Sequence, residues 1–380
     1  MDRRVSRAPR AAAAKPAGQK GSAARAVVKT VNLALQGGGS HGAYTWGALD
    51  ALAEDGRIEI SAISGASAGA MNAVVFASGM EGGREGARAA LEKFWLSVST
   101  EGSLAPIERK WLDGALQAWG GYWPGARLID AWTDAVSGLL SPYEFNPLNV
   151  NPLRVHLEQA VDFERLRASE GLQLFIAATN VRTGRGQIFR RDVLAADHVM
   201  ASACLPQLFQ AVMIGGEPYW DGGFAGNPPL WPLFYETHCR DAIIIQINPI
   251  ERDEAPRTPA EIDNRVDEIT FNASLIAELR AADFVARLIR RGLLKSDEYR
   301  EERLHRIGGA GQLEQFSAAT KTDVSWPFLT QLRDLGRADT KAWLDENFDK
   351  IGVESTLDMD KALQREPAKP PTKGAAATAR

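Results

Sequence analysis

Cysteines, histidines and long apolar runs are scarce in this sequence. Its 380 residues include two cysteines, Cys204 and Cys239, and five histidines. Two thiols cannot form a disulfide framework or a cysteine-rich zinc site, and such low usage is typical of proteins in a reducing compartment. No run of eighteen apolar residues is present, and the amino-terminal segment lacks the apolar stretch of a secretory signal. We therefore expect a cytoplasmic protein with no metal site and no membrane-spanning helix.

Positive charge is concentrated at the two ends of the chain. The formal net charge is −4, yet residues 1–30 hold eight Lys and Arg against one Asp, and residues 367–380 hold three basic residues and no acid. The residues between these ends therefore carry a net −14. We expect 1–26 and 367–380 to be disordered tails, because they show no apolar periodicity. Such tails suit attraction to an anionic membrane or a lipid inclusion, or nonspecific contacts, and they indicate no specific nucleic-acid partner.

The order of apolar segments predicts an α/β fold. Hydrophobic residues make up 45% and charged residues 24%, as in soluble globular proteins. Glycine-rich loops and helical runs follow the first two strand-like segments, an order that requires crossovers and a parallel sheet. The predicted strands are residues 27–36, 58–64, 172–181 and 241–250, with a hairpin-like segment at 184–191. We therefore expect three layers, with a mostly parallel central sheet flanked by helices.

A main domain over residues 27–310 contains these strands, and an aromatic-rich stretch interrupts it. Half of the ten tryptophans lie within 94–150, where Gly and Pro break any regular pattern. We interpret 94–150 as a helical cap insertion, either a lid that dips into lipid or a cap whose aromatics form its own core. Residues 258–295 show the apolar spacing of one or two amphipathic helices. Residues 311–366 are predicted as a helical C-terminal extension.

Residues Gly37–Gly42 form a glycine loop between a predicted strand and a predicted helix. The loop satisfies the G-x-G-x-x-G pattern, and Glu59 follows about twenty residues later, so a dinucleotide-binding loop is one interpretation. Glu59, however, falls within the predicted second strand rather than at its end. A lone glycine pattern is weak support for cofactor binding, and we predict no cofactor.

A second glycine-rich turn places Ser67 in a nucleophile-elbow pattern. Gly65-Ala66-Ser67-Ala68-Gly69 reads G-x-S-x-G at a strand-to-helix turn, where a strained serine needs small neighbours on both sides. The amino terminus of the following helix would also favour an oxyanion near the hydroxyl. A tight connection without chemistry is the alternative, but the flanking strand and helix favour a nucleophilic serine.

A nucleophilic Ser67 needs a base, and the histidines do not supply a convincing one. His238 precedes a strand, at the wrong edge of the sheet for chemistry at strand ends. His305 lies in the charged stretch 301–306, which is typical of a solvated helix face. A base other than histidine is therefore expected.

Asp221 offers such a base. Two glycines follow it, in a turn that can present a carboxylate to another loop. Apolar neighbours such as Trp220 and Phe224 would raise the pKa of Asp221 and make it a useful base. An aspartate that merely caps a turn is the alternative.

The glycine loop has a role without a nucleotide if Ser67 is a nucleophile. The backbone N–H groups of Gly37, Gly38 and Gly39 can approach a tetrahedral oxyanion more closely than residues with side chains. Loss of one such donor typically costs ~3 kcal/mol of transition-state stabilisation. Ser67, Asp221 and these glycines together predict an acyl-transfer site.

Three motifs, in this order, resemble those of the patatin-like phospholipases. They are the glycine loop 37–42, the elbow 65–69 and, some 150 residues later, the turn 221–223. The resemblance covers about residues 31–295, and it implies a patatin-like fold with no metal and no catalytic histidine. It assigns the nucleophile, the base and the oxyanion hole to Ser67, Asp221 and Gly37 to Gly39.

One position departs from the family pattern. Family members usually have Arg or Lys just before the last glycine of the loop, where this chain has His41. A basic residue there would anchor the loop or meet an anionic head group, and histidine is charged only part of the time near pH 7. His41 is thus either a structural substitute or, like Trp220, a residue beside the substrate.

The implied activity is that of a serine acyl hydrolase, which cleaves carboxylic esters of lipids through an acyl-enzyme. The phospholipase or lysophospholipase A type is the nearest class. The alternatives are an esterase acting on neutral esters or an intracellular polyester, and a non-catalytic lipid- or nucleotide-binding protein on the same fold. We expect a lipid or hydrophobic ester as partner, and a cytoplasmic location at the surface of a membrane or lipid inclusion. No sequence feature indicates an oligomeric state.

Overall fold

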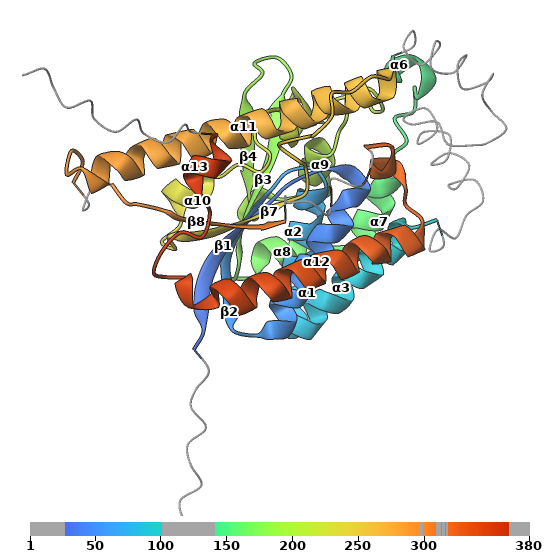
Figure 1. Cartoon of the computed structure of the whole chain (residues 1–380). Coiled ribbons are helices and arrows are strands. Elements are labelled where there is room, and N and C mark those ends of the chain that lie inside the picture. Colours follow the sequence, from blue (N-terminus) through green and yellow to red (C-terminus); the bar gives the residue numbers. More distant parts are fainter. Residues whose placement is uncertain are drawn as a thin grey trace, which may run out of the picture.

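An eight-stranded mixed β-sheet forms the centre of the molecule (Figure 1). The computed structural model describes residues 27–100, 141–295, 299–308 and 318–364, together with residues 313 and 316. The strand order is β5-β6-β3-β2-β1-β7-β8, and β4 pairs with β3 outside this order. The strands are β1 (Lys29–Leu35), β2 (Ile58–Gly65), β3 (Gln173–Asn180), β4 (Gly186–Arg190), β5 (Val212–Ile214), β6 (Glu217–Asp221), β7 (Asp241–Gln246) and β8 (Arg303–Gly308).

The centre of the sheet is parallel and one edge is antiparallel. β1 pairs in parallel with β2 and β7, β2 pairs with β3, and β7 pairs with β8. β4 and β6 run antiparallel to β3, and β5 runs antiparallel to β6. The predicted strands correspond to β1, β2, β3 and β7, and the hairpin-like segment is β4. The predicted α/β class with helices around a largely parallel sheet is confirmed.

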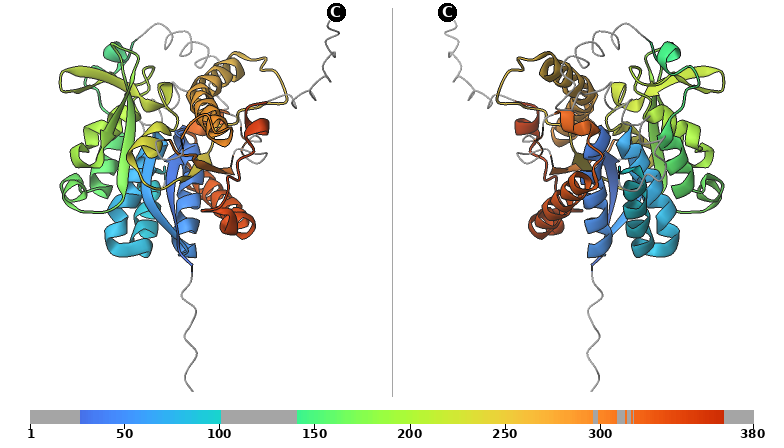
Figure 2. Two further views of the ribbon diagram at one scale, coloured as in Figure 1. Left: turned by 90° about the vertical axis from the view of Figure 1, so that its left-hand side faces the viewer. Right: turned by 90° about the vertical axis from the view of Figure 1, so that its right-hand side faces the viewer.

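Helices cover both faces of the sheet (Figure 1 and Figure 2). Alternation along β1 explains the two cores, since Val31, Leu33 and Leu35 face one layer and Ala34 faces the other. The first layer contains α1, α2, α3, α7, α8, α9 and α12, and the second contains α10, α11 and α13. Within the described ranges, no helix is both long and apolar enough to cross a bilayer.

The helices are α1 (Gly42–Asp55), α2 (Ala68–Gly79), α3 (Gly83–Val98), α6 (Pro142–Phe145), α7 (Pro152–Ala160), α8 (Phe163–Ala168), α9 (Ala196–Ser202), α10 (Trp231–Glu236), α11 (Pro259–Arg290), α12 (Trp326–Asn347) and α13 (Met359–Ala362). Short 3₁₀ helices join them: η1 (Gly39–His41), η2 (Met80–Gly82), η3 (Arg191–Val193), η4 (Gly222–Phe224), η5 (Ala318–Thr322) and η6 (Phe348–Lys350). The amphipathic pattern predicted over 258–295 is one helix, α11.

Helix α12, from the C-terminal part of the chain, packs directly along α1. A β-carbon on Gly47 would lie 1.9 Å from Arg333 O, and one on Gly336 would lie 2.1 Å from Tyr44 O. Only glycine allows two helix backbones to approach so closely. The segment predicted as an extension, 311–366, therefore contributes α12 to a helical layer of the fold.

Residues 301–306 are not the solvated helix face that their charges suggest. They lead into the edge strand β8, in which His305 is completely buried. Arg303 pairs with Asp241 of β7, with 2.6 Å between Nη2 and Oδ2. The prediction of a helix face is wrong because these residues form a strand in which Leu304 and His305 are buried, and Asp241 of β7 pairs with both Arg303 and His305.

The aromatic stretch begins inside the main core rather than in a cap. α3 extends through Phe94 and Trp95, and both are buried against α1 and α2. These two aromatic residues therefore belong to the core beside the sheet. Residues 101–140, which hold four of the tryptophans, lie outside the described residues, as do the predicted tails.

Candidate active site

Ser67 occupies a strained turn between β2 and α2. Its φ of 53° and ψ of −126° lie in a region that residues with a side chain rarely adopt, at a typical cost of about 1–3 kcal/mol. A β-carbon on Gly65 would lie 2.8 Å from Gly69 C, and one on Gly69 would lie 2.2 Å from Leu35 O. The G-x-S-x-G glycines are therefore required by close backbone approach, as a sharp strand-to-helix turn demands.

Asp221 lies beside Ser67, at the end of β6. It is completely buried, and its Oδ1 accepts a hydrogen bond from Gly223 N–H at 2.7 Å. Oδ2 has no well-formed hydrogen bond within the part of the chain that the structure describes. The Ser67 side chain lies close enough to this carboxyl to lower its pKa. The residues predicted as nucleophile and base are thus brought together.

Burial raises the pKa of Asp221 to about 7. The hydrogen bond from Gly223 N–H and the nearby Ser67 hydroxyl oppose this rise, and the negative charge of Asp267 adds to it. A carboxyl with a pKa near the working pH can both accept a proton and return it. The electrostatics therefore suit a general base.

The surroundings of Asp221 differ in part from the predicted ones. Side chains alternate along a strand, so Trp220 faces the opposite side of β6 from Asp221. Phe224 packs edge-on against Phe271 of α11, with ring centroids 5.4 Å apart. A β-carbon on Gly223 would lie 3.1 Å from Phe271 Cε1. Helix α11, rather than Trp220, closes this turn.

The glycine loop lies directly against the elbow. A β-carbon on Gly37 would lie 2.5 Å from Ser67 Cβ, so no larger residue fits there. Gly37 N–H donates to Asn227 Oδ1 at 2.7 Å, so this amide is already occupied. Gly38 N–H and Gly39 N–H make no hydrogen bond to any described residue. Of the three predicted donors, these two have amides left for an oxyanion.

Four buried amide side chains hold the loop in place. Gln36 Oε1 accepts a hydrogen bond from Asn248 N–H at 2.9 Å, and Asn248 Nδ2 donates to Gly37 O at 2.6 Å. Gln36 Nε2 donates to Asn227 O and to Asn272 Oδ1, each at 3.1 Å. Because these amides are buried and interconnected, they fix the position of the loop peptides.

Sequence motifs alone do not single out these amides. A usable signal is position, since Gln36 follows β1 and Asn248 lies just beyond β7, where the carboxyl ends of parallel strands meet. Polar side chains at that edge commonly face a site. Asn227 and Asn272 carry no such signal, because a loop and a helix bring them to the site only through tertiary packing.

Helix α11 also fixes the segment that follows Asp221. Glu278 Oε2 accepts hydrogen bonds from the N–H groups of Leu230 at 2.7 Å and Trp231 at 2.8 Å. Ser274 Oγ accepts one from Asn227 N–H at 3.2 Å. Apolar spacing predicts this helix, but not that its polar side chains support the site.

His41 is buried between the glycine loop and η5. Its Nε2 lies 2.8 Å from Thr320 Oγ1, and its ring contacts Phe316 and Phe328. Burial, followed by the charge of Lys321, lowers the pKa of His41 to about 3. The imidazole is therefore neutral near pH 7 and brings no charge to a head group.

His305 belongs to a different network, at the other end of the sheet. Its Nε2 lies 3.1 Å from Asp241 Oδ1, and its Nδ1 lies 3.0 Å from Thr356 Oγ1. Asp241 begins β7, whereas the site lies beyond the opposite end of that strand. Among the described residues, no group of three or more His, Cys, Asp or Glu side chains is arranged to hold a metal ion.

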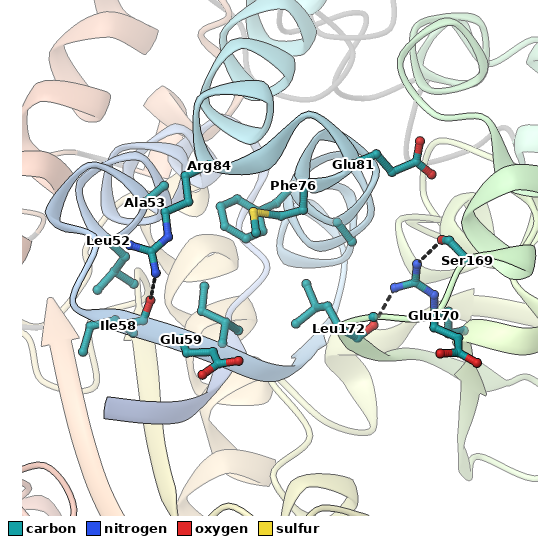
Figure 3. A pocket seen from close by; sticks show the side chains of 15 residues that line it. Leu52, Ala53, Ile58, Glu59, Phe76, Glu81, Arg84, Ser169, Glu170 and Leu172 are labelled. Atoms are coloured by element: carbon teal, nitrogen blue, oxygen red, sulfur yellow. Dashed lines mark hydrogen bonds between the residues drawn. The ribbon is translucent and has the colours of Figure 1, made fainter. Parts of the chain in front are cut away.

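The dinucleotide interpretation lacks its ribose contact. Glu59 pairs with Thr30 at the amino ends of β2 and β1, about 20 Å along the strand from Gly65. There it lines the pocket in Figure 3, in which Arg84 donates to Ile58 O at 3.1 Å. An acid in this place cannot reach a ribose bound at the glycine loop.

Similarity to known proteins covers the glycine loop, Ser67 and Asp221. Residues 33–234 match the family described as Patatin-like phospholipase. A search of curated proteins gives no significant match. VipD from Legionella pneumophila aligns over 80% of this chain and 67% of its own, at 17% identity and a TM-score of 0.35. A chain of the SpcU–ExoU complex from the type III secretion system of Pseudomonas aeruginosa aligns over 89% of this chain and 77% of its own, at 15% identity and a TM-score of 0.29.

Proposed function

Because the chain belongs to the patatin-like phospholipase family, a family of lipid acyl hydrolases, we propose that it is a serine acyl hydrolase that cleaves carboxylic esters of lipids. The observation that carries this proposal is that Ser67, on its strained turn, lies close enough to the buried Asp221 to lower its pKa, which is about 7. Acyl transfer requires a nucleophilic side chain beside a base whose pKa lies near the working pH.

In the proposed mechanism, Ser67 Oγ attacks the ester carbonyl while Asp221 accepts its proton. Asp221 then returns the proton to the leaving alcohol, and the acyl group stays on Ser67 as an ester. Water, activated by Asp221, hydrolyses this ester and restores both side chains. Because Asp221 must be ionised at the outset, a pKa near 7 balances its availability against its strength as a base.

We assign the oxyanion to the Gly38 and Gly39 N–H groups. Their amides have no acceptor among the described residues, whereas the Gly37 amide is held by Asn227. Each such donor typically contributes ~3 kcal/mol of transition-state stabilisation. Gly37 then contributes through its lack of a side chain, which lets the loop lie against Ser67.

Phospholipids or lysophospholipids are the proposed substrates, and neutral esters or an intracellular polyester are the alternative. The neutral state of His41 supports keeping that alternative, since it removes one contact to an anionic head group. The basic ends of the chain support work at a membrane or lipid-inclusion surface in the cytoplasm.

A panel of ester substrates tests the proposal. Chromogenic esters of increasing acyl length, a lysophospholipid, a phospholipid in mixed micelles and an aliphatic polyester are each given to wild type, Ser67→Ala and Ser78→Ala. Wild type and the control Ser78→Ala, changed at the far end of α2, should hydrolyse at least one class, and Ser67→Ala none. If wild type binds vesicles but releases no carboxylic acid, the hydrolase proposal is overturned and a lipid-binding protein is favoured.

A further inference from the structure

A segment outside the family match, η5, holds the glycine loop from its other side. Ser40 Oγ donates to Thr320 O at 2.8 Å. A β-carbon on Gly39 would lie 2.5 Å from Lys321 O, so the two backbones are in direct contact. The C-terminal extension therefore places Lys321 beside the loop.

Hydrogen bonds connect the Lys321 ammonium to the loop. Nζ donates to Asn248 Oδ1 at 3.0 Å, and Asn248 Nδ2 donates to Gly37 O at 2.6 Å. The Gly37 carbonyl and the Gly38 N–H belong to one planar peptide group. A charge at Lys321 therefore polarises a continuous chain of amides that ends at Gly38 N–H.

The charges around Lys321 indicate a specific role for its ammonium. Burial lowers the pKa of Lys321, with Arg252 adding to the fall, while Glu268 and Asp267 of α11 oppose it. His41 on the same loop is neutral near pH 7. Lys321 is thus a cationic side chain that is connected to the loop through Asn248, so its charge can act toward a developing oxyanion.

We propose that Lys321 is a positioning residue of the oxyanion hole, whose ammonium acts through Asn248 and the Gly37 peptide to strengthen Gly38 N–H as a hydrogen-bond donor to the tetrahedral oxyanion. This inference rests on the proposed acyl hydrolase function. It gives the C-terminal extension a part in the chemistry, and it supplies the charge that His41 does not carry.

Lys321→Gln and Lys321→Arg test the inference, with Lys350→Gln as a matched control. Lys350 Nζ also donates to an asparagine oxygen, Asn347 Oδ1, at 2.8 Å. Its helix η6 lies at the amino end of β1, where Phe348 O accepts from Lys29 Nζ. The kcat and KM for a chromogenic ester are measured for each full-length variant. Turnover is expressed per serine titrated by a fluorophosphonate, and thermal unfolding is recorded.

Lys321→Gln should lower kcat about tenfold to hundredfold, less than the loss of a direct donor, with little change in KM. Lys321→Arg, which keeps the charge, should retain most of the activity, and Lys350→Gln all of it. If Lys321→Gln does not fold, Lys321→Met repeats the test with the same expected result. An unchanged kcat in Lys321→Gln, or an equal loss in Lys321→Arg, would overturn the inference.

The pH profile gives a second readout that a packing role would not move. Wild-type kcat should fall as rising pH removes the proton of Lys321, at a pH below the ordinary lysine range because burial lowers this pKa, and this alkaline limb should be absent in Lys321→Gln. The other groups facing Lys321 are Asp267, Glu268, Arg252 and His41, and these side-chain types ordinarily titrate outside the alkaline range. An alkaline limb retained in Lys321→Gln would contradict the inference. Wild type that neither turns over nor labels would instead overturn the proposed function itself.

Discussion

Gly37 and Ser67 stand so close that a β-carbon on Gly37 would lie 2.5 Å from Ser67 Cβ. The two residues are thirty positions apart, one after β1 and the other after β2, and adjacent parallel strands bring them to the same edge. The absence of a side chain at Gly37 thus sets the distance between the glycine loop and the hydroxyl of Ser67.

Gly37→Ala should therefore disrupt activity more than stability. The new methyl must displace either the loop or the elbow, and a misplacement of about 1 Å can cost about a hundredfold in rate. Steady-state kinetics on a chromogenic ester and thermal unfolding measure the two effects. Gly82→Ala is the control, because its φ is −88° and a β-carbon there meets no atom within 4 Å. Wild-type kcat in Gly37→Ala would contradict the proposed contact.

Asn227→Ala should weaken both the fold and the reaction. It removes the acceptor of the buried Gly37 N–H, at a cost of about 1–3 kcal/mol. Gly38, an assigned oxyanion donor, follows Gly37 directly in the chain. A displaced Gly37 should therefore lower kcat while KM changes little. Chemical denaturation and ester kinetics check both outcomes.

A matched control for Asn227→Ala is Asn151→Ala, at the start of α7. Asn151 Oδ1 accepts from Leu153 N–H at 3.1 Å and caps that helix, so its loss should cost about 1 kcal/mol without any change in kcat. If Asn227→Ala keeps full turnover, the amide network does not position the loop.

Asp221→Asn should abolish turnover and stabilise the protein at alkaline pH. The pKa of Asp221 is about 7 in the folded chain and about 4 in an unfolded one. The unfolded chain therefore loses this proton first, so wild-type stability falls as pH rises from about 4 to about 7 and is constant above. An asparagine does not ionise and escapes that loss.

Thermal unfolding of wild type and Asp221→Asn at pH 4 and pH 8 makes the comparison. The two proteins should differ little at pH 4, and the variant should gain up to about 4 kcal/mol at pH 8. An advantage of equal size at both pH values would mean that ionisation of Asp221 is not its cause.

Ser67→Gly should be more stable than Ser67→Ala, although both should be inactive. Glycine relieves the strain of a φ of 53°, about 1–3 kcal/mol, and gives back about 0.5–1 kcal/mol through the unfolded chain. A net gain of about 1 kcal/mol is expected in denaturation experiments. At Ser78, inside α2, the alanine variant should be more stable than the glycine variant. If glycine is the more stable variant at both positions, or alanine at both, the turn at Ser67 is not strained.

The sequence is a good guide to features that depend on local spacing. G-x-S-x-G and the alternating strand before it predict the turn at Ser67, since close backbone contacts exclude larger residues there. Asp221 is predicted because two glycines follow it, and in the folded chain the Ser67 side chain is near enough to lower its pKa. Both signals lie within a few residues of the group that they identify.

Features created by packing between distant segments are not predictable in this way. Nothing near Gly37 indicates that Asn227, 190 positions later, takes its N–H. Likewise, the burial that neutralises His41 comes from η5 and α12, far along the chain. The strand β8 is misread as a helix face because its charges are satisfied by partners such as Asp241 that only the folded sheet supplies.

Covalent labelling of Ser67 tests the central claim most directly. The folded protein is treated with a fluorophosphonate, and the adduct is counted by intact mass and located by peptide mapping. The account predicts one adduct per chain, on Ser67, formed much more slowly in Asp221→Asn and absent from Ser67→Ala. A folded wild-type protein that forms no adduct, or that is modified on another serine while Ser67 stays free, would contradict it.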